Sequence, residues 1–191
     1  MRHSPYTAVY DANVLYPAPL RDFLMRLALT GAYRARWSAL IHDEWKRNLL
    51  LNRTDLTAEQ LNRTSELMDQ AIPDALVTDY EAIVAGLELP DQDDRHVLAV
   101  AIKCNASAIV TFNLKDFPKA SLEPFGIEAL HPDDFIADLW DLDQAAVLEA
   151  ARRQRAALKK PPHSVREYLD KLLQQKLPET VKLLSDFEFL L

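Results

Sequence analysis

The sequence has little of several residue types, and each shortage argues against a class of protein or site. Only 3 of its 191 residues are glycine, which argues against the glycine-rich phosphate loops of dinucleotide-binding and P-loop proteins. The single cysteine, Cys104, excludes an internal disulfide and a zinc site built from cysteines. No apolar run approaches the ~18 residues of a membrane span, and residues 1–6 lack the apolar core of a signal peptide. These absences favour a cytoplasmic protein.

Positive charge is also scarce. The chain has 22 Lys and Arg residues against 29 Asp and Glu residues, which gives a formal net charge of −7 at pH 7. Non-specific affinity for nucleic acid comes mainly from basic residues that meet phosphates. A nucleic-acid substrate would therefore require basic residues gathered on one surface, whereas the excess of acid fits a cluster of metal-binding carboxylates.

The pattern of apolar residues predicts an α/β fold. Five short β-branched or apolar stretches are expected as strands, and helical periodicity fills the segments between them. Because strands and helices alternate, we expect a parallel sheet flanked by helices. The expected strands are 7–10, 33–37, 75–78, 106–111 and 126–130. The expected helices are 20–29, 39–51, 61–72, 95–104, 132–140, 145–158, 165–176 and 179–187, with a short one closed by Gly86.

The composition changes near Asp143, after which the chain has helical segments only. We therefore expect two parts. The first is an α/β domain over residues 1–141, and the second is a helical extension over residues 142–191.

Polar side chains fall where the predicted strands end and where two helices begin. Asp11 ends the first strand and Asn113 follows the fourth, while Glu44 lies early in a helix and Asp94 opens an apolar one. Ligands of open α/β sheets bind at the carboxyl ends of the strands. Oxygen ligands without His or Cys suit Mg²⁺ or Mn²⁺, and such a metal can activate water and hold a phosphodiester.

Simpler interpretations exist for each acid. Asp11 would satisfy backbone donors in the turn after a strand, and Glu44 would be a solvated helix residue. Asp91, Asp93 and Asp94 precede a helix, where acids cap free amides and favour the positive end of the helix dipole. The joint pattern supports a site more strongly than any single residue does.

Together these segments resemble the PIN-domain ribonuclease family. More narrowly, they resemble VapC-type toxins of type II toxin–antitoxin systems, in the subgroup with an added C-terminal helical segment. The resemblance spans roughly residues 6–135. The residues that carry it are Asp11-Ala-Asn13-Val-Leu, Glu44, the segment 91–101 and the segment 109–117.

This resemblance implies a three-layer α/β/α domain and an endoribonuclease that uses Mg²⁺ or Mn²⁺ to hydrolyse RNA phosphodiester bonds. It also implies a cognate antitoxin protein as partner and a homodimer. An alternative stays open, because Asn113 stands where the family often has a fourth acid: a catalytically degenerate PIN scaffold that binds RNA or protein without cleavage. A phosphohydrolase with Asp11 as nucleophile is less favoured, because the second acid expected two residues later is Asn13.

Carried over by position, the resemblance assigns roles to named residues. The catalytic set is Asp11, Glu44, Asp94 and Asn113. The metal ligands are Asp11, Glu44 and Asp94, with Asp91 and Asp93 as outer ligands. The supporting residues are Asn13, Thr111 and Asp116.

Basic residues are candidates for substrate binding. Arg47 lies close to Glu44 in the sequence, and Arg152, Arg153 and Arg155 cluster in the helical extension. A solvated helix face is an equally good interpretation of the second group. His96, inside the apolar helix, is interpreted as an interior histidine with satisfied nitrogens rather than as a general base.

Overall fold

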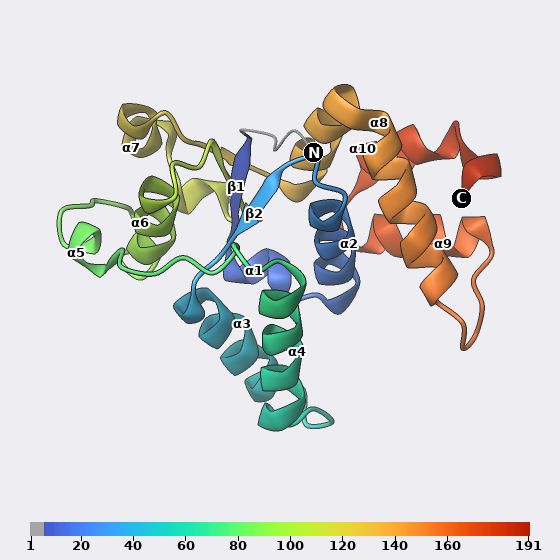
Figure 1. Ribbon diagram of the computed structural model, residues 1–191, viewed down its shortest axis with the longest axis horizontal. Helices are drawn as coiled ribbons and strands as arrows, with labels where there is room; N and C mark the ends of the chain where they lie inside the picture. The colour runs from blue at the N-terminus through green and yellow to red at the C-terminus, as the bar shows by residue number, and fades with distance from the viewer. Residues whose placement is uncertain (1–5) are drawn as a thin grey trace. The chain divides into compact units, whose positions relative to one another are not determined.

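The computed structural model describes residues 6–191 (Figure 1). Residues 1–5, which belong to the stretch without signal-peptide character, lie outside the described residues. The chain divides into two compact units. We call the first the sheet unit; it comprises the described residues up to Tyr16 together with Tyr33–His131. We call the second the helical unit; it comprises Pro17–Ala32 and Pro132–Leu191.

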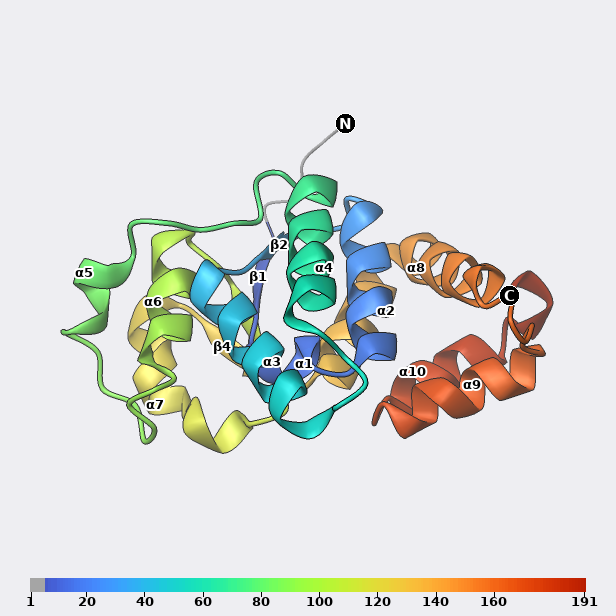
Figure 2. The same cartoon turned by 90° about the horizontal axis from the view of Figure 1, so that it is seen from below.

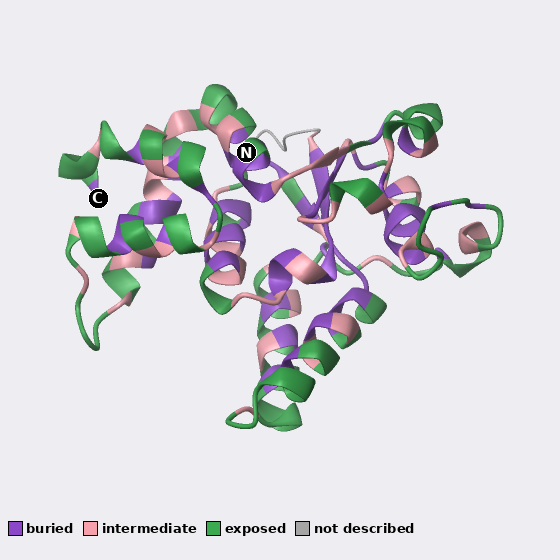
Figure 3. Cartoon of the chain, turned by 180° about the vertical axis from the view of Figure 1, so that it is seen from behind, coloured by how far each residue is buried: buried purple, intermediate pink, exposed green. Residues whose placement is uncertain are grey.

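A parallel sheet of four strands forms the centre of the sheet unit. The strands are β1 (Thr7–Tyr10), β2 (Arg34–Arg36), β3 (Ala108–Val110) and β4 (Glu128–Leu130), in the order β2-β1-β3-β4. Every residue of β1 and β3 is buried, as the purple ribbon of Figure 3 shows. Strands of a parallel sheet that are covered on both faces have nearly continuous apolar sequences. The two central strands could therefore be predicted.

Two helices of the sheet unit begin at residues whose side chains cap them as the sequence predicted. The side chain of Ser38 accepts a hydrogen bond from the backbone of Ile41, and Thr57 and Gln60 form the predicted capping box. The helix that follows Asp94 is buried and contacts β1 and β3. The helices are α1 (Ala12–Leu15), α3 (Ala39–Asn52), α4 (Ala58–Ala71), α5 (Glu81–Val84), α6 (Arg95–Lys103) and α7 (Lys119–Leu122), with 3₁₀ turns at Leu114–Asp116 and Glu123–Phe125.

The helical unit contains α2 (Ala18–Leu29), α8 (Pro132–Ala157), α9 (Val165–Gln174), α10 (Pro178–Ser185) and a 3₁₀ turn at Glu188–Leu190 (Figure 2). Helix α8 is kinked at Asp143, whose φ and ψ of −154° and 79° are not helical. The Asp143 carboxylate accepts a hydrogen bond from the backbone N–H of Ala146 at 3.0 Å, which starts the second half of the helix. The predicted break between residues 140 and 145 is therefore confirmed.

The predicted fold class is confirmed as a parallel sheet with flanking helices and a C-terminal helical region. The strand predicted at residues 75–78 is wrong, because that segment forms a single parallel bridge between Trp37 and Leu76. Only Ala75 is fully buried there, whereas Leu76 is 40% exposed, so little apolar surface favours a longer pairing. The domain boundary between residues 141 and 142 stays a prediction. No helix in the described part of the chain has the length and apolar character to cross a membrane.

Candidate metal and active site

The site lies where β1 and β3 end, as expected for a parallel sheet. A hollow of about 480 Å³ opens there, within the sheet unit. Asp11, Glu44 and Asp94, which the sequence predicted to converge, all line this hollow, and so does Asn113. The complete lining is Asp11, Ala12, Asn13, Tyr16, Glu44, Arg47, Asn48, Asn52, Asp94 and Asn113.

Asp11 is held by three hydrogen bonds in a nearly dry position, with 5% of its surface exposed. One carboxylate oxygen, Oδ1, accepts from the backbone N–H of Ala12 at 2.7 Å. The other, Oδ2, accepts from Asn13 Nδ2 and from the hydroxyl of Thr111, both at 2.7 Å. Asp11 therefore satisfies a backbone donor after the strand, as the simpler interpretation held, and is also fixed toward the hollow by side chains.

Thr111 and Asn13 connect Asp11 to the segment that follows β3. Asn13 Nδ2 also donates to Thr111 Oγ1 at 2.9 Å, and Asn13 Oδ1 accepts from the backbone of Phe112 at 3.1 Å. The hydroxyl oxygen of Thr111 accepts from the backbone N–H of Asn113 at 3.0 Å. Asn13 and Thr111, two of the three residues predicted to support the site, thus lock the ends of two neighbouring strands to each other.

Glu44 is oriented by His96, a residue whose role in the site was not predicted from the sequence. His96 is 5% exposed, and its Nε2 lies 3.0 Å from Glu44 Oε1. The other ring nitrogen, Nδ1, is buried and has no hydrogen-bond partner within residues 6–191. The interpretation of His96 as an interior histidine is right, but its nitrogens are not both satisfied. The interaction with Glu44 places the ring against the site.

Of the three acids before α6, Asp91, Asp93 and Asp94, only Asp94 lines the hollow. Asp94 occupies the N-cap position of α6, yet its side chain makes no capping hydrogen bond, so its carboxylate is available to the hollow. Asp91 Oδ1 accepts from the backbone of Asp93 at 2.9 Å and shapes the turn. Asp93 is exposed and belongs neither to the lining of the hollow nor to the acidic cluster described next.

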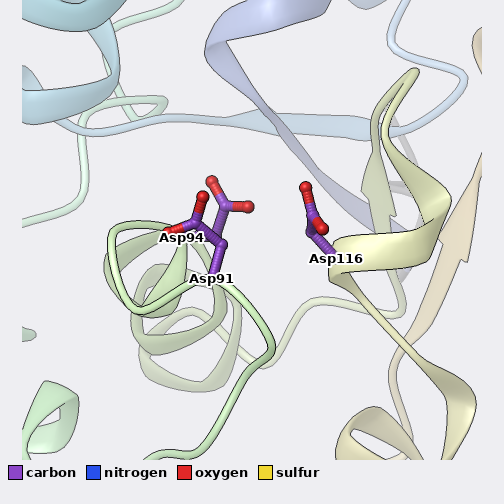
Figure 4. Close-up of side chains that lie close together, drawn as sticks. All are labelled: Asp91, Asp94 and Asp116. Atoms are coloured by element: carbon purple, nitrogen blue, oxygen red, sulfur yellow. The ribbon is translucent and has the colours of Figure 1, made fainter.

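A cluster of three carboxylates adjoins the hollow. Asp91, Asp94 and Asp116 each offer one oxygen atom, and these atoms all lie within 4.8 Å of one another. Figure 4 shows Asp91 and Asp94 on the loop before α6, with Asp116 opposite them. Asn113 Nδ2 donates to Asp116 Oδ2 and connects the cluster to the end of β3. Asp94 is the residue that the hollow and the cluster share.

Burial and the neighbouring carboxylates shift the pKa of Asp94, the residue that the hollow and the cluster share. The pKa of Asp94 is raised to about 7, first by burial and then by the charges of Asp11, Asp91, Asp116 and Glu44. Burial also raises the pKa of Asp11, and the charge of Glu44 raises it further. Hydrogen bonds from Thr111 and from the backbone of Ala12 to the Asp11 carboxylate oppose this increase. A positive partner would therefore favour the ionisation of all these groups together.

The predicted basic residues lie in both units. Arg47 lines the hollow, is exposed and forms no ion pair with the described residues. In the helical unit, Arg152 and Arg153 both pair with Glu149, at 2.9 and 2.6 Å. Arg155 donates to the backbone carbonyls of Leu191 and His163, at 2.9 and 2.6 Å. Substrate binding by the three arginines of the helical unit stays a prediction.

Comparison with known proteins adds two family matches. Residues 7–115 match the model of the PIN domain, and residues 132–186 match the model of the VapC50 C-terminal domain. Over 82 residues, the chain is 45% identical to a protein of Mycobacterium tuberculosis named "Putative ribonuclease VapC50". That match covers 43% of this chain and 48% of the relative, so the chain spans about half the length of that protein. No solved structure gave a significant match.

Proposed function

Because the chain belongs to the PIN domain family, we propose that it is an endoribonuclease that depends on Mg²⁺ or Mn²⁺ and hydrolyses RNA phosphodiester bonds. One observation carries the proposal: Asp11, Glu44 and Asp94, far apart in the sequence, line one hollow together with Arg47, which forms no ion pair with the described residues. The 45% identity over 82 residues to a protein named "Putative ribonuclease VapC50" supports the same activity.

The donor set fits a hard divalent cation. The candidate ligands are carboxylates, and neither a cysteine nor a histidine lines the hollow or belongs to the acidic cluster. Mg²⁺ and Mn²⁺ prefer such oxygen ligands. Burial and, after it, repulsion by neighbouring carboxylates raise the pKa of Asp94, and a bound cation would offset the repulsion. We propose Asp11, Glu44 and Asp94 as the principal ligands, with Asp91 and Asp116 beside them.

The residues of the chain would prepare the reaction in distinct ways. Asn13 and Thr111 fix the orientation of Asp11, and His96 fixes that of Glu44. Arg47 offers positive charge to the phosphate backbone at the edge of an acidic hollow. A bound divalent cation would polarise the phosphate and lower the pKa of a coordinated water.

The biological role that we propose is that of the toxin in a toxin–antitoxin pair. The resemblance to VapC-type toxins and the match of residues 132–186 to the VapC50 C-terminal domain support this role. It implies a cognate antitoxin protein as partner, a homodimer and a cytoplasmic location, which we propose with it. Expression should arrest growth, and co-expression of a small protein encoded beside this chain should relieve the arrest.

Matched variants test the activity. We expect Asp11→Asn, Glu44→Gln and Asp94→Asn to lose RNA cleavage while they keep the circular dichroism spectrum of the wild type. Asp43→Asn is the control, because Asp43 is exposed and lies next to Glu44 in the same helix. Excess EDTA should stop cleavage, and Mg²⁺ or Mn²⁺ should restore it.

Other outcomes would identify the alternatives. RNA binding without turnover across Mg²⁺ and Mn²⁺ titrations would indicate a degenerate scaffold. A trapped aspartyl-phosphate at Asp11 would indicate a phosphohydrolase. Full cleavage in excess EDTA would contradict the proposed function.

A further inference from the structure

One wall of the hollow is a face of α3 that leads away from the acids. Glu44, Arg47, Asn48 and Asn52 line the hollow, and their spacing places them on one side of the helix over successive turns. Glu44 is half-buried, whereas the other three residues are exposed. This face therefore runs from the acidic site to the solvent.

The polar groups on this face are largely unused within the described part of the chain. The guanidinium of Arg47 forms no ion pair there, and the carboxamide of Asn48 forms no hydrogen bond. Asn52 Nδ2 donates to the backbone carbonyl of Asn48 at 2.8 Å, which leaves Asn52 Oδ1 as an acceptor. By contrast, the ammonium group of Lys46, the residue before Arg47, forms an ion pair with Asp43 at 3.3 Å and donates a hydrogen bond to Asn62 Oδ1 at 3.0 Å.

An aromatic side chain completes this part of the lining. Tyr16 is half-buried, follows α1 and lines the same hollow. The combination of a cation, two carboxamides and an aromatic ring beside a group of acids matches the parts of a nucleotide. A guanidinium pairs with phosphate. A carboxamide offers both a donor and an acceptor to the edge of a base, and an aromatic ring can stack on its face.

We propose that Tyr16, Arg47, Asn48 and Asn52, here called the α3 subsite, bind the nucleotide next to the scissile phosphate of a single-stranded RNA. Arg47 pairs with the phosphate of that nucleotide, and the two carboxamides hydrogen-bond to the edge of its base. We expect a single strand, because sequence-specific recognition of RNA mostly targets unpaired bases and the major groove of an RNA duplex is too deep and narrow for side chains. The inference rests on the proposed function, because the subsite is defined by its position next to the phosphate that the acids would cleave.

The α3 subsite would therefore determine which sequence is cleaved, while the acids determine that cleavage occurs. Each hydrogen bond between neutral groups contributes about 0.5–1.5 kcal/mol, which corresponds to roughly a 2- to 10-fold effect. Loss of one carboxamide should weaken the base preference by that factor. Loss of Arg47 should instead raise KM for all sequences alike and reduce the salt dependence of binding.

The experiment compares cleavage of an RNA library that is randomised on both sides of the cut. The proteins are the wild type, Asn48→Ala, Asn52→Ala and Arg47→Gln. Asn62→Ala is the control, because Asn62 is an exposed asparagine on α4 that does not line the hollow. Sequencing of the new RNA ends gives the base preference, and anisotropy of a labelled single strand gives binding. Circular dichroism checks that each variant is folded.

We expect the asparagine variants to lose base preference at one position while kcat on the preferred sequence falls by less than tenfold. If the wild type cleaves and both asparagine variants keep its preference and KM, the α3 subsite is wrong and the nuclease assignment stands. If the wild type does not cleave with Mg²⁺ or Mn²⁺, the nuclease assignment is wrong. The anisotropy data then test the α3 subsite by themselves. Weaker binding of the labelled single strand by Asn48→Ala and Arg47→Gln would support it, and unchanged binding would contradict it.

Discussion

Replacing Thr111 with valine should weaken the site without altering any of its acids. The Thr111 side chain is fully buried, and its hydroxyl donates to Asp11 Oδ2 at 2.7 Å. It also accepts from Asn13 Nδ2 and from the backbone of Asn113. Valine has nearly the same shape as threonine, so Thr111→Val removes these three interactions and little else.

The magnitude follows from the groups left unpaired. A hydrogen bond to a charged group contributes about 1.5–3 kcal/mol, and an unsatisfied buried donor costs about 1–3 kcal/mol. Asp11 keeps two other donors and valine adds apolar surface, so we expect a net loss of about 2 kcal/mol in the free energy of unfolding. Substitutions of residues that orient metal ligands usually cost 10- to 100-fold in metal affinity or activity. We expect Mn²⁺ affinity to fall within that range.

Two further variants separate the hydroxyl from other effects. Thr111→Ser keeps the hydroxyl and should retain Mn²⁺ affinity close to that of the wild type. Thr78→Val is the matched control, because its hydroxyl also donates to an aspartate, Asp79, at 3.0 Å but in an exposed position. The Thr78 variant should change stability by less than about 0.5 kcal/mol. Urea unfolding and isothermal titration with Mn²⁺ provide the measurements, and a Thr111→Val protein with wild-type stability and affinity would refute the reasoning.

Three other predictions address other parts of the chain. His96→Leu should lower kcat at least tenfold, whereas His96→Gln, which keeps an N–H near the position of Nε2, should recover most of it; equal rates for both variants would contradict an orienting role. Because the metal-free pKa of Asp94 is about 7, its carboxyl must release a proton to bind a cation below that pH. Mn²⁺ affinity should therefore fall up to tenfold per pH unit below 7 and level off above 8, and calorimetry that shows no change between pH 5.5 and 8.5 would contradict this. Asp133→Ala should cost about 2 kcal/mol in urea unfolding, because the buried carboxylate of Asp133 caps α10 through two backbone N–H groups and the Thr180 hydroxyl, all within 2.8 Å. The exposed Asp134→Ala provides its control.

The features that depend on neighbouring residues could be predicted from the sequence. The capping residues Ser38, Thr57 and Ser164 act on backbone groups within three positions, and the apolar runs of β1 and β3 need only burial on both faces. The place of Asp11 was also predictable, because parallel strands end at one edge of a sheet and Asp11 follows the first of them.

Contacts that depend on the tertiary arrangement could not be predicted in the same way. The interaction between His96 and Glu44 joins residues 52 positions apart, and no spacing rule relates them. The direction of Asp116 depends on the 3₁₀ turn at Leu114–Asp116 and on the bond from Asn113. The turn brings the Asp116 carboxylate to Asp91 and Asp94.

The environment of Asp94 depends both on local contacts within its segment and on contacts that the tertiary fold creates. Its position at the start of α6 is a local property, and an acid there would ordinarily cap the helix. In this fold the capping bond is absent, and the charges around Asp94 come from segments that only the sheet brings together. The strand ends and helix starts therefore place the carboxylates, while the tertiary fold makes their joint ionisation unfavourable. That cost is what a divalent cation would offset, so the affinity that we propose for the cation would be a property of the fold rather than of any one motif.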